Sequence, residues 1–250
     1  MSNMDTIQID FKYLPDWADI EPIVPASNAL PTWYKDASPM VDTDSGAHGT
    51  FKSCPAILDS MMQGYILPLW ADIWVEPSSQ FINGKPIPSF SLTSQRDMEW
   101  GMIRFHPVEM TQEMPSIASL DMPISLKLDS PWMVRTPENY SMLYLPPLNN
   151  KDSRFEAVSG VVCTDEYVSF INLPLMWTAP PDYRGLIKKG TPLAQLIPFK
   201  REIFQQELGC ITQEEFDATV DYSNALSRDR EIVEGMGVYK QLWHPTARSR

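Results

Sequence analysis

Between residues 65 and 199, short apolar runs alternate with polar residues and are separated by prolines. In residues 124–128, Ile124, Leu126 and Leu128 lie on one face, which is the period of two of a half-buried strand. Residues 103–106 and 168–173 have the same alternation. Proline cannot donate a hydrogen bond to a sheet, so the 23 prolines favour short strands, edges and ordered loops over long helices. The pattern predicts a mainly β fold, a compact barrel or clip of short strands punctuated by prolines.

One apolar run, residues 193–199, is entered from a basic turn at Lys188, Lys189 and Gly190. Gly190 can take the positive φ that such a tight turn requires. Gln195 is the single amide in the run. Because Leu193 and Ile197 flank Gln195 on the same face of a strand, we expect this side chain to be at least half buried and hydrogen-bonded to the backbone.

Two stretches have helical spacing. A short helix is predicted near residues 54–63, with an apolar stripe and with Gly64 where the residue after a helix is often glycine. A second, C-terminal helix is predicted near residues 213–234, because Thr212 and Glu215 have the spacing of a capping box.

The first fifty residues differ from the rest in being rich in aromatics and prolines and poor in periodicity. They predict either an arm that reaches a partner or a strap on the chain's own core. The expected organisation has three parts: an extended arm at 1–50, a β domain at 51–205, and a helix with tail at 206–250. The side chains that we expect to contact a partner are aromatic: Trp17, Trp33, Tyr34 and, in the tail, Trp243.

Composition narrows the function classes. The 250 residues carry a formal net charge of −12, so the surface repels phosphate backbones and we expect no strong nucleic-acid binding. The N-terminus lacks the basic start and apolar core of a signal peptide, and the longest apolar runs are too short to span a bilayer. Three widely spaced cysteines favour neither a disulfide framework nor a thiolate zinc site. We therefore expect a protein made in the cytoplasm, without a membrane partner.

The sequence presents no assembled catalytic constellation. It has no nucleophile elbow, no Walker-type loop and no dinucleotide-binding glycine motif. The histidines, His48, His106 and His244, lack the spacing of an iron or zinc site. Accordingly we expect no metal, no cofactor and no catalytic residue, and we favour a protein that is not an enzyme.

Three blocks of sequence resemble an uncharacterised family carried by marine tailed phages and scattered bacteria. They are KSCP at 52–55 running into GYILPLWAD at 64–72, SPWMVRTPENY at 130–140, and GTPLAQLIPFKRE at 190–202. The resemblance implies a phage or bacterial origin, and it implies nothing about chemistry.

A more distant likeness covers SGVVCTDEY at 159–167 and the block at 190–199. These are similar to the last conserved motifs of the dUTPase and dCTP deaminase superfamily, where an acidic turn lies beside the nucleoside and an Ala-Gln strand contacts phosphate. Cys163 stands where the catalytic aspartate would be, and of the acidic pair only Asp165 is kept. Residues 141–146 lack the arginine of the phosphate loop. The resemblance implies a β-clip scaffold without pyrophosphate hydrolysis, a scaffold that also occurs in phage head-decoration proteins.

Two functions remain open at this point. The first is a non-catalytic, phage-type structural or interaction protein that assembles with itself or with other virion proteins through its arm or its C-terminal segment. It would be made in the host cytoplasm and end in the virion. The alternative is a protein, catalytic or not, that binds a small molecule or nucleotide on a dUTPase-like scaffold. Its predicted ligand-binding residues are Cys163, Asp165 and Gln195.

Overall fold

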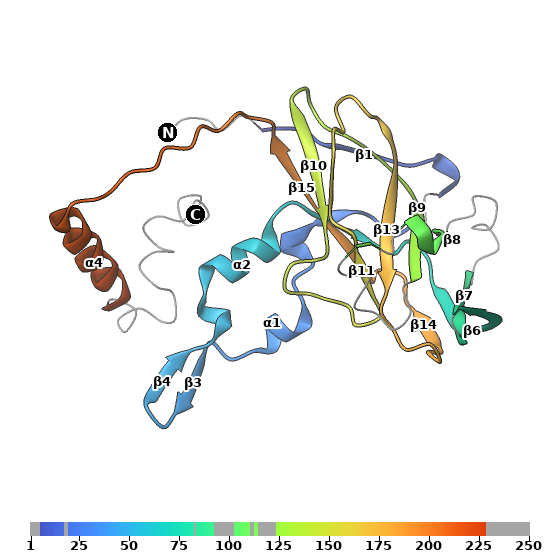
Figure 1. Ribbon diagram of the computed structural model, residues 1–250, viewed down its shortest axis with the longest axis horizontal. Helices are drawn as coiled ribbons and strands as arrows, with labels where there is room; N and C mark the ends of the chain where they lie inside the picture. The colour runs from blue at the N-terminus through green and yellow to red at the C-terminus, as the bar shows by residue number, and fades with distance from the viewer. Residues whose placement is uncertain are drawn as a thin grey trace. The chain divides into compact units, whose positions relative to one another are not determined.

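The computed structural model of the chain describes residues 6–17, 20–82, 84–92, 103–110, 113–114 and 124–228 (Figure 1). These residues form two compact units, Met1–Ala29 with Met61–Arg201, and Leu30–Ser60 with Glu202–Arg250. Most of the first unit is strand. The strands of the first unit are β1 (Asp10–Lys12), β2 (Val24–Pro25), β5 (Tyr65–Pro68), β6 (Ile73–Ile82), β7 (Lys85–Leu92), β8 (Ile103–Phe105), β9 (Ile124–Arg135), β10 (Tyr140–Leu145), β11 (Phe155–Ala157), β12 (Gly160–Val162), β13 (Ser169–Trp177), β14 (Gly185–Ile187) and β15 (Pro192–Lys200).

The strands of the first unit pair in antiparallel fashion into three sheets. One five-stranded sheet has the order β1-β9-β13-β11, with β8 also paired to β9, and a second has the order β12-β10-β15-β5-β2. A three-stranded sheet, β14-β6-β7, completes the unit. The predicted mainly β fold is confirmed.

The core of the first unit is built from the alternate residues that the sequence pattern marks. Leu126 and Leu128 of β9 are buried together with Leu173 of β13 and with Met142 and Leu196 of the second sheet. One hydrophobic cluster therefore joins both large sheets, as in a two-layer β fold. Burial of these side chains supplies the main force that holds the two sheets together.

Prolines lie inside several strands as well as at strand ends. Pro131 is in the middle of β9, which runs for 12 residues. There the pairing of β9 with β13 shifts register, between the pairs Phe170–Met133 and Asn172–Asp129. A strand tolerates proline where its ladder is interrupted, because the missing N–H is then not needed.

The helix predicted near residues 54–63 is confirmed as α2, Pro55–Met62. Gly64 follows it with a φ of +65°, and a Cβ atom at this position would lie 2.0 Å from the carbonyl oxygen of Leu196. Gly190 has a φ of +85°, as predicted for the turn before β15. Its surroundings are open by comparison, since the nearest atom to a Cβ there would be the Glu21 Oε1 at 3.7 Å.

Residues 6–29 belong to the same unit as the sheets. β1 pairs with β9 and β2 pairs with β5. The Tyr13 ring meets the Trp132 ring edge-on, with 4.9 Å between centroids. Trp132 Nε1 donates a hydrogen bond to the Glu21 carbonyl oxygen at 3.2 Å. This stretch is thus tied to the sheets by backbone and side-chain bonds, while the predicted three-part division of the chain stays a prediction.

The second unit contains two separate stretches of chain. The first holds α1 (Thr32–Asp36) and the hairpin of β3 (Met40–Thr43) with β4 (Gly46–Gly49). The second is an extended run, residues 202–212, followed by α4, Gln213–Arg228. The predicted capping box begins α4: the Thr212 N–H donates to Glu215 Oε2 at 2.7 Å, and the Glu215 N–H donates to Thr212 Oγ1 at 3.2 Å. The remainder of the helix predicted to residue 234 lies outside the described residues.

Candidate functional site

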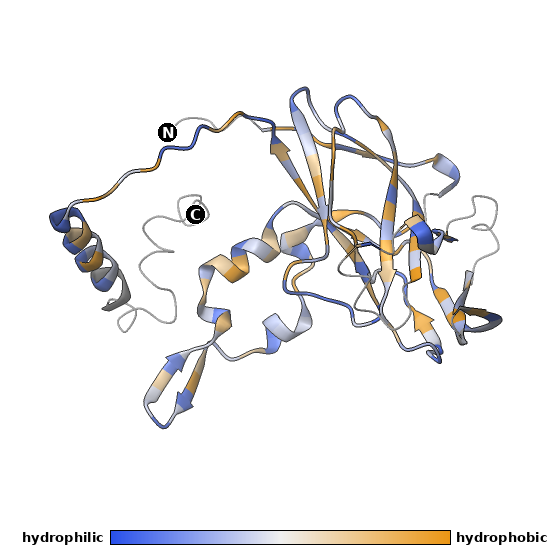
Figure 2. Ribbon diagram, viewed as in Figure 1, coloured by the Kyte–Doolittle hydropathy of each residue, from blue (hydrophilic) through white to orange (hydrophobic). Residues whose placement is uncertain are grey.

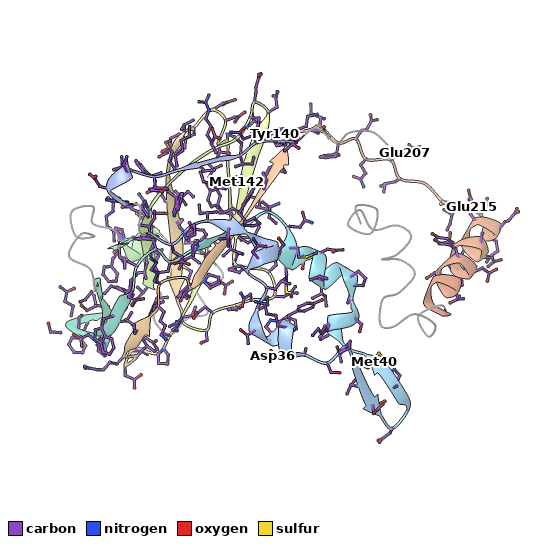
Figure 3. The ribbon with its side chains drawn as sticks, turned by 180° about the vertical axis from the view of Figure 1, so that it is seen from behind. Asp36, Met40, Tyr140, Met142, Glu207 and Glu215 are labelled. Atoms are coloured by element: carbon purple, nitrogen blue, oxygen red, sulfur yellow. The ribbon has the colours of Figure 1, made fainter. Side chains whose placement is uncertain are left out.

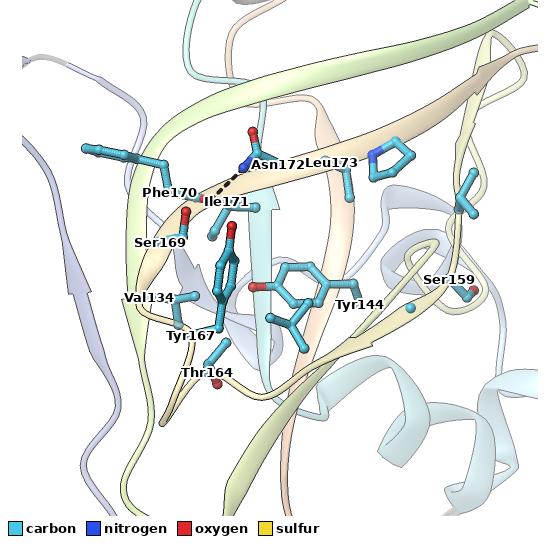
Figure 4. Close-up of a pocket in the computed structure, with 14 residues that line it drawn as sticks. Val134, Tyr144, Ser159, Thr164, Tyr167, Ser169, Phe170, Ile171, Asn172 and Leu173 are labelled. Carbon is cyan, nitrogen blue, oxygen red and sulfur yellow. Dashed lines mark hydrogen bonds between the residues drawn. The ribbon is translucent and has the colours of Figure 1, made fainter. Parts of the chain in front are cut away.

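A cavity of about 240 Å³ lies in the first unit where β12 and β13 diverge (Figure 4). β12 is the last strand of its sheet. On the facing side, β11 pairs with β13 only between Leu175 and Trp177. The two strand edges therefore separate around residues 169–174, and the gap between the sheets opens to the surface.

The floor of the cavity is apolar and its rim is polar. Val134, Ile171 and Leu173 are buried core residues that also line the cavity. Ser159, Thr164 and Asn172 add polar atoms to the lining. A concave, largely apolar surface with a few polar groups is the usual form of a small-molecule site.

Two tyrosines lie across this cavity from one another. Tyr144 of β10 is buried, and its phenol points into the pocket toward Tyr167, which is 63% exposed (Figure 4). Burial raises the pKa of Tyr144 above its ordinary value, because the phenolate would lose its hydration. Tyr144 is therefore a neutral hydroxyl at physiological pH, suited to hydrogen bonding and unsuited to act as a base.

The turn that joins β12 to β13 is fixed by an ion pair. Arg201 donates to Asp165 Oδ1 from NH1 at 2.8 Å and to Oδ2 from NH2 at 2.5 Å. The Asn139 N–H also donates to Asp165 Oδ2, at 2.9 Å. These bonds, led by that of Arg201, lower the pKa of Asp165 to about 2. The Asp165 side chain is only 6% exposed, so both of its oxygens are committed to the protein.

Arg201 also anchors the end of β15. Its N–H donates to the Asn139 carbonyl oxygen at 2.8 Å, and NH1 donates to Ser141 Oγ at 3.0 Å. The cavity wall, the end of β10 and the end of β15 thus meet at one guanidinium group. Because it touches protein groups only, we describe Arg201 as a positioning residue for the β12–β13 turn.

The three residues predicted to bind a ligand occupy different environments. Cys163 is exposed at the start of the turn, where its carbonyl oxygen accepts from the Tyr167 N–H at 2.8 Å. Gln195 is 1% exposed. It accepts from the Leu148 N–H at 3.0 Å and donates to the Gln63 carbonyl oxygen at 2.7 Å. The expectation that Gln195 is buried and bonded to the backbone is confirmed, and the structure does not bring Cys163, Asp165 and Gln195 together along the cavity lining.

The aromatic residues predicted to contact a partner also differ in environment. Trp17 is half-buried in the first unit. In the second unit Tyr34 is buried, its hydroxyl donating to the Lys52 carbonyl oxygen at 3.1 Å, and Trp33 is 43% exposed. Trp243 lies outside the described residues. Of the described three, Trp33 is the one with a largely exposed ring.

A second candidate surface is the C-terminal segment, by which we mean residues 202–228. Every residue from 202 to 224 is exposed. Ile203 is fully exposed, and Phe204 and Leu208 are 86% and 84% exposed. Figure 2 shows the apolar positions recurring along the extended run and on α4, and Figure 3 shows the side chains of Glu207 and Glu215 on the same segment.

Sequence reasoning missed Tyr144, Thr164, Tyr167 and Arg201 as residues of the site. Tyr144 alternates with Met142 along β10, which marked it as a core residue only. The other three were placed by pairings across distant segments. Arg201 is 36 residues from Asp165 in sequence, and no local pattern joins the two.

Comparison with known proteins gives a weak likeness. No family model and no curated protein matches the chain. Among solved structures, the chain is similar to a mutant dUTPase from phage phi11 of S. aureus, whose title describes a structural Mg(II) ion. Identity is 15% over 38% of this chain and 76% of that chain, with a TM-score of 0.26. The likeness fits the distant dUTPase resemblance, and the resemblance to the marine phage family stays a prediction.

Two further observations concern membranes and metals. None of the helices in the described part of the chain is long and apolar enough to cross a membrane. Among the described residues, no group of three or more His, Cys, Asp or Glu side chains is arranged to hold a metal ion.

Proposed function

We propose that the chain is a non-catalytic structural or interaction protein that assembles through its C-terminal segment. The observation that carries this proposal is the run of large apolar side chains exposed between Ile203 and Tyr222. The expected partners are further copies of the chain or, following the phage resemblance, other virion proteins.

The size of the exposed apolar surface supports this function. Fully burying a Leu, Ile or Phe side chain stabilises a protein by about 1.5–3 kcal/mol. Isolated exposed apolar residues are common on protein surfaces, whereas several in succession mark an interaction site. Ile203, Phe204, Leu208 and Ile211 follow one another within nine residues of chain, and each is more than half exposed. The segment gains stability only when a partner covers it.

The test compares the full chain with a double variant, Phe204→Ser and Leu208→Ser. Light scattering measures the mass of each, alone and mixed with purified proteins encoded beside it. We expect the double variant to lose the association that the natural chain shows. Phe51→Ser is the matched control, because Phe51 is 75% exposed outside the segment. Equal masses for the natural chain and the double variant in every mixture would contradict the proposal.

A second function, small-molecule binding, is favoured by the cavity between β12 and β13. Its volume of about 240 Å³ is just below the roughly 300–1,000 Å³ of drug-sized sites. It therefore suits a single ring system, such as a nucleobase or a nucleoside. Tyr144, Thr164 and Asn172 would supply the polar contacts, and Ile171 and Leu173 the apolar floor.

Thermal unfolding in the presence of nucleobases and nucleosides tests this second function. Gly160→Phe should abolish any stabilisation by ligand, because Gly160 lines the cavity and a Cβ atom there meets nothing within 4 Å. Gly209→Phe is the control, since Gly209 is equally open and does not line the cavity. If every compound leaves the unfolding temperature unchanged, or if both variants respond like the natural chain, the cavity is not a binding site for this class.

A further inference from the structure

The outer face of the sheet β12-β10-β15 carries a continuous apolar surface. Val161, Leu143 and Ile197 lie side by side across the three strands, as the register of the strand pairs shows. Val161 is 58% exposed, and Leu143 and Ile197 are partly exposed. Phe199, two residues after Ile197 on the same side of β15, is also exposed. We call Leu143, Val161, Ile197 and Phe199 the outer face.

Strand alternation makes the direction of this face certain. Met142 and Leu196, which are next to Leu143 and Ile197 in sequence, are fully buried in the core. Successive side chains of a strand point to opposite sides of the sheet. Leu143 and Ile197 therefore point away from the core, where polar residues would be expected on a face in contact with water.

We propose that this outer face is the surface on which the C-terminal segment of a second copy of the chain packs. The inference rests on the proposed function and names its partner and its docking surface. Both surfaces are present in every copy, and both are exposed. A reciprocal exchange between two copies covers both surfaces in one closed, two-fold contact. A different partner protein bound to the segment would leave the outer face exposed.

The available area is that of a stable dimer. Large aromatic side chains bury roughly 150–250 Å² each, and a standard interface buries about 800 Å² on each partner. Phe204, Phe216 and Tyr222 are aromatic and more than half exposed, and Ile203 and Leu208 are exposed aliphatic residues. One segment therefore carries about enough apolar surface to cover one outer face.

Charge also favours this pairing. Between residues 202 and 227 the segment contains six acidic residues and no Lys or Arg. Lys200 is exposed next to Phe199, at the end of the outer face. Acidic groups at the edge of the segment and a cation at the edge of the face would orient the two surfaces as they meet.

The test uses full-length variants of the two surfaces. Val161→Glu places an acidic group in the middle of the outer face, and Phe204→Ser with Leu208→Ser weakens the segment. We expect the natural chain to self-associate and each variant to raise the dissociation constant by roughly tenfold or more. Phe81→Ser is the control, because Phe81 is 63% exposed on β6, outside both surfaces. Val161→Thr, which keeps a β-branched side chain on the strand, should give a smaller effect in the same direction and replaces Val161→Glu if that variant does not fold.

Mixing the two variants gives the sharpest result. Each retains one intact surface, so we expect a mixed dimer held by one segment on one face, at an affinity between those of the natural chain and either variant alone. If the face variants self-associate like the natural chain while the segment variant does not, the docking surface is overturned and assembly through the segment stands. A natural chain that stays monomeric at all concentrations overturns the inference, and the proposed function then depends on a different protein partner.

Discussion

The β core and the C-terminal segment treat similar side chains in opposite ways. In the core, Leu126, Met142 and Leu196 alternate with outward residues and are almost completely buried. In the C-terminal segment, Ile203, Phe204 and Leu208 have comparable apolar surface and are left exposed. The core satisfies its apolar residues within one chain, whereas the segment does not.

This difference separates stability from function. Buried polar groups of the core, such as Gln195 and Asp165, are hydrogen-bonded to protein partners and serve the fold. Groups available to other molecules are found at the cavity between β12 and β13, on the outer face and along the segment. Mutations in the core should therefore change the free energy of unfolding, and mutations in the segment should change association.

The largest effect on unfolding is expected from Gly64→Ala. A Cβ atom at this position would lie 2.0 Å from the Leu196 carbonyl oxygen, and the residue has a φ of +65°. Backbone must move to relieve a contact with backbone, so we expect a loss of about 3 kcal/mol or more. Chemical denaturation measures it.

Gly190→Ala is the matched control for Gly64→Ala. Gly190 shares the positive φ but has open surroundings. Its loss should be confined to backbone strain, about 1 kcal/mol. Equal losses at the two glycines would show that the close approach to Leu196 does not matter.

Gln195→Leu should have the next largest effect. Leucine keeps the volume but leaves the Leu148 N–H and the Gln63 carbonyl oxygen without their side-chain partner. A buried group left unpaired costs about 1–3 kcal/mol. Gln80→Leu, at an exposed position of β6, should change the free energy of unfolding by less than about 0.5 kcal/mol. A loss at Gln195 as small as that at Gln80 would show that water replaces the amide.

The ion pair of Asp165 with Arg201 should make stability depend on pH in acid. The folded pKa of Asp165, about 2, lies below the ordinary value of about 3.9 for an unfolded chain. Its contribution is therefore fully present above about pH 4 and is lost as the pH falls toward 2. Asp165→Asn should flatten the decline of the unfolding temperature between these pH values.

Arg201→Gln provides the second half of that test. It removes the partner that lowers the pKa of Asp165, so it should flatten the same part of the pH profile. The double variant should resemble either single variant, because each change removes one pair. Additive effects of the two substitutions would show that Asp165 and Arg201 act independently.

The smallest effect on unfolding is expected from Phe204→Ser with Leu208→Ser. Both side chains are exposed, so the unfolding of the β core should change by less than about 0.5 kcal/mol at protein concentrations too low for association. Fluorescence of the core tryptophans during denaturation reports this transition. A loss comparable to that of Gln195→Leu at low concentration would erase the distinction between core and segment.

Local pattern was sufficient for much of the fold. The alternation in residues 124–128, the helix beginning at Pro55 and the capping box of Thr212 with Glu215 were each predicted from spacing and are confirmed. Gly190 and Gln195 were predicted from the residues flanking them, and their positive φ and burial are confirmed. These features depend on contacts within a few residues of chain.

The candidate site depended on tertiary structure. The cavity forms because the edges of β12 and β13 separate, and its wall is fixed by Arg201, 36 residues from Asp165. The outer face exists because β10, β12 and β15 pair in one register, which brings Leu143, Val161 and Ile197 into a row. The sequence by itself determined which residues could be strand, turn and cap, since those preferences act locally. Only the tertiary structure decided which of them meet, because strand pairing joins segments whose separation along the chain carries no local signal.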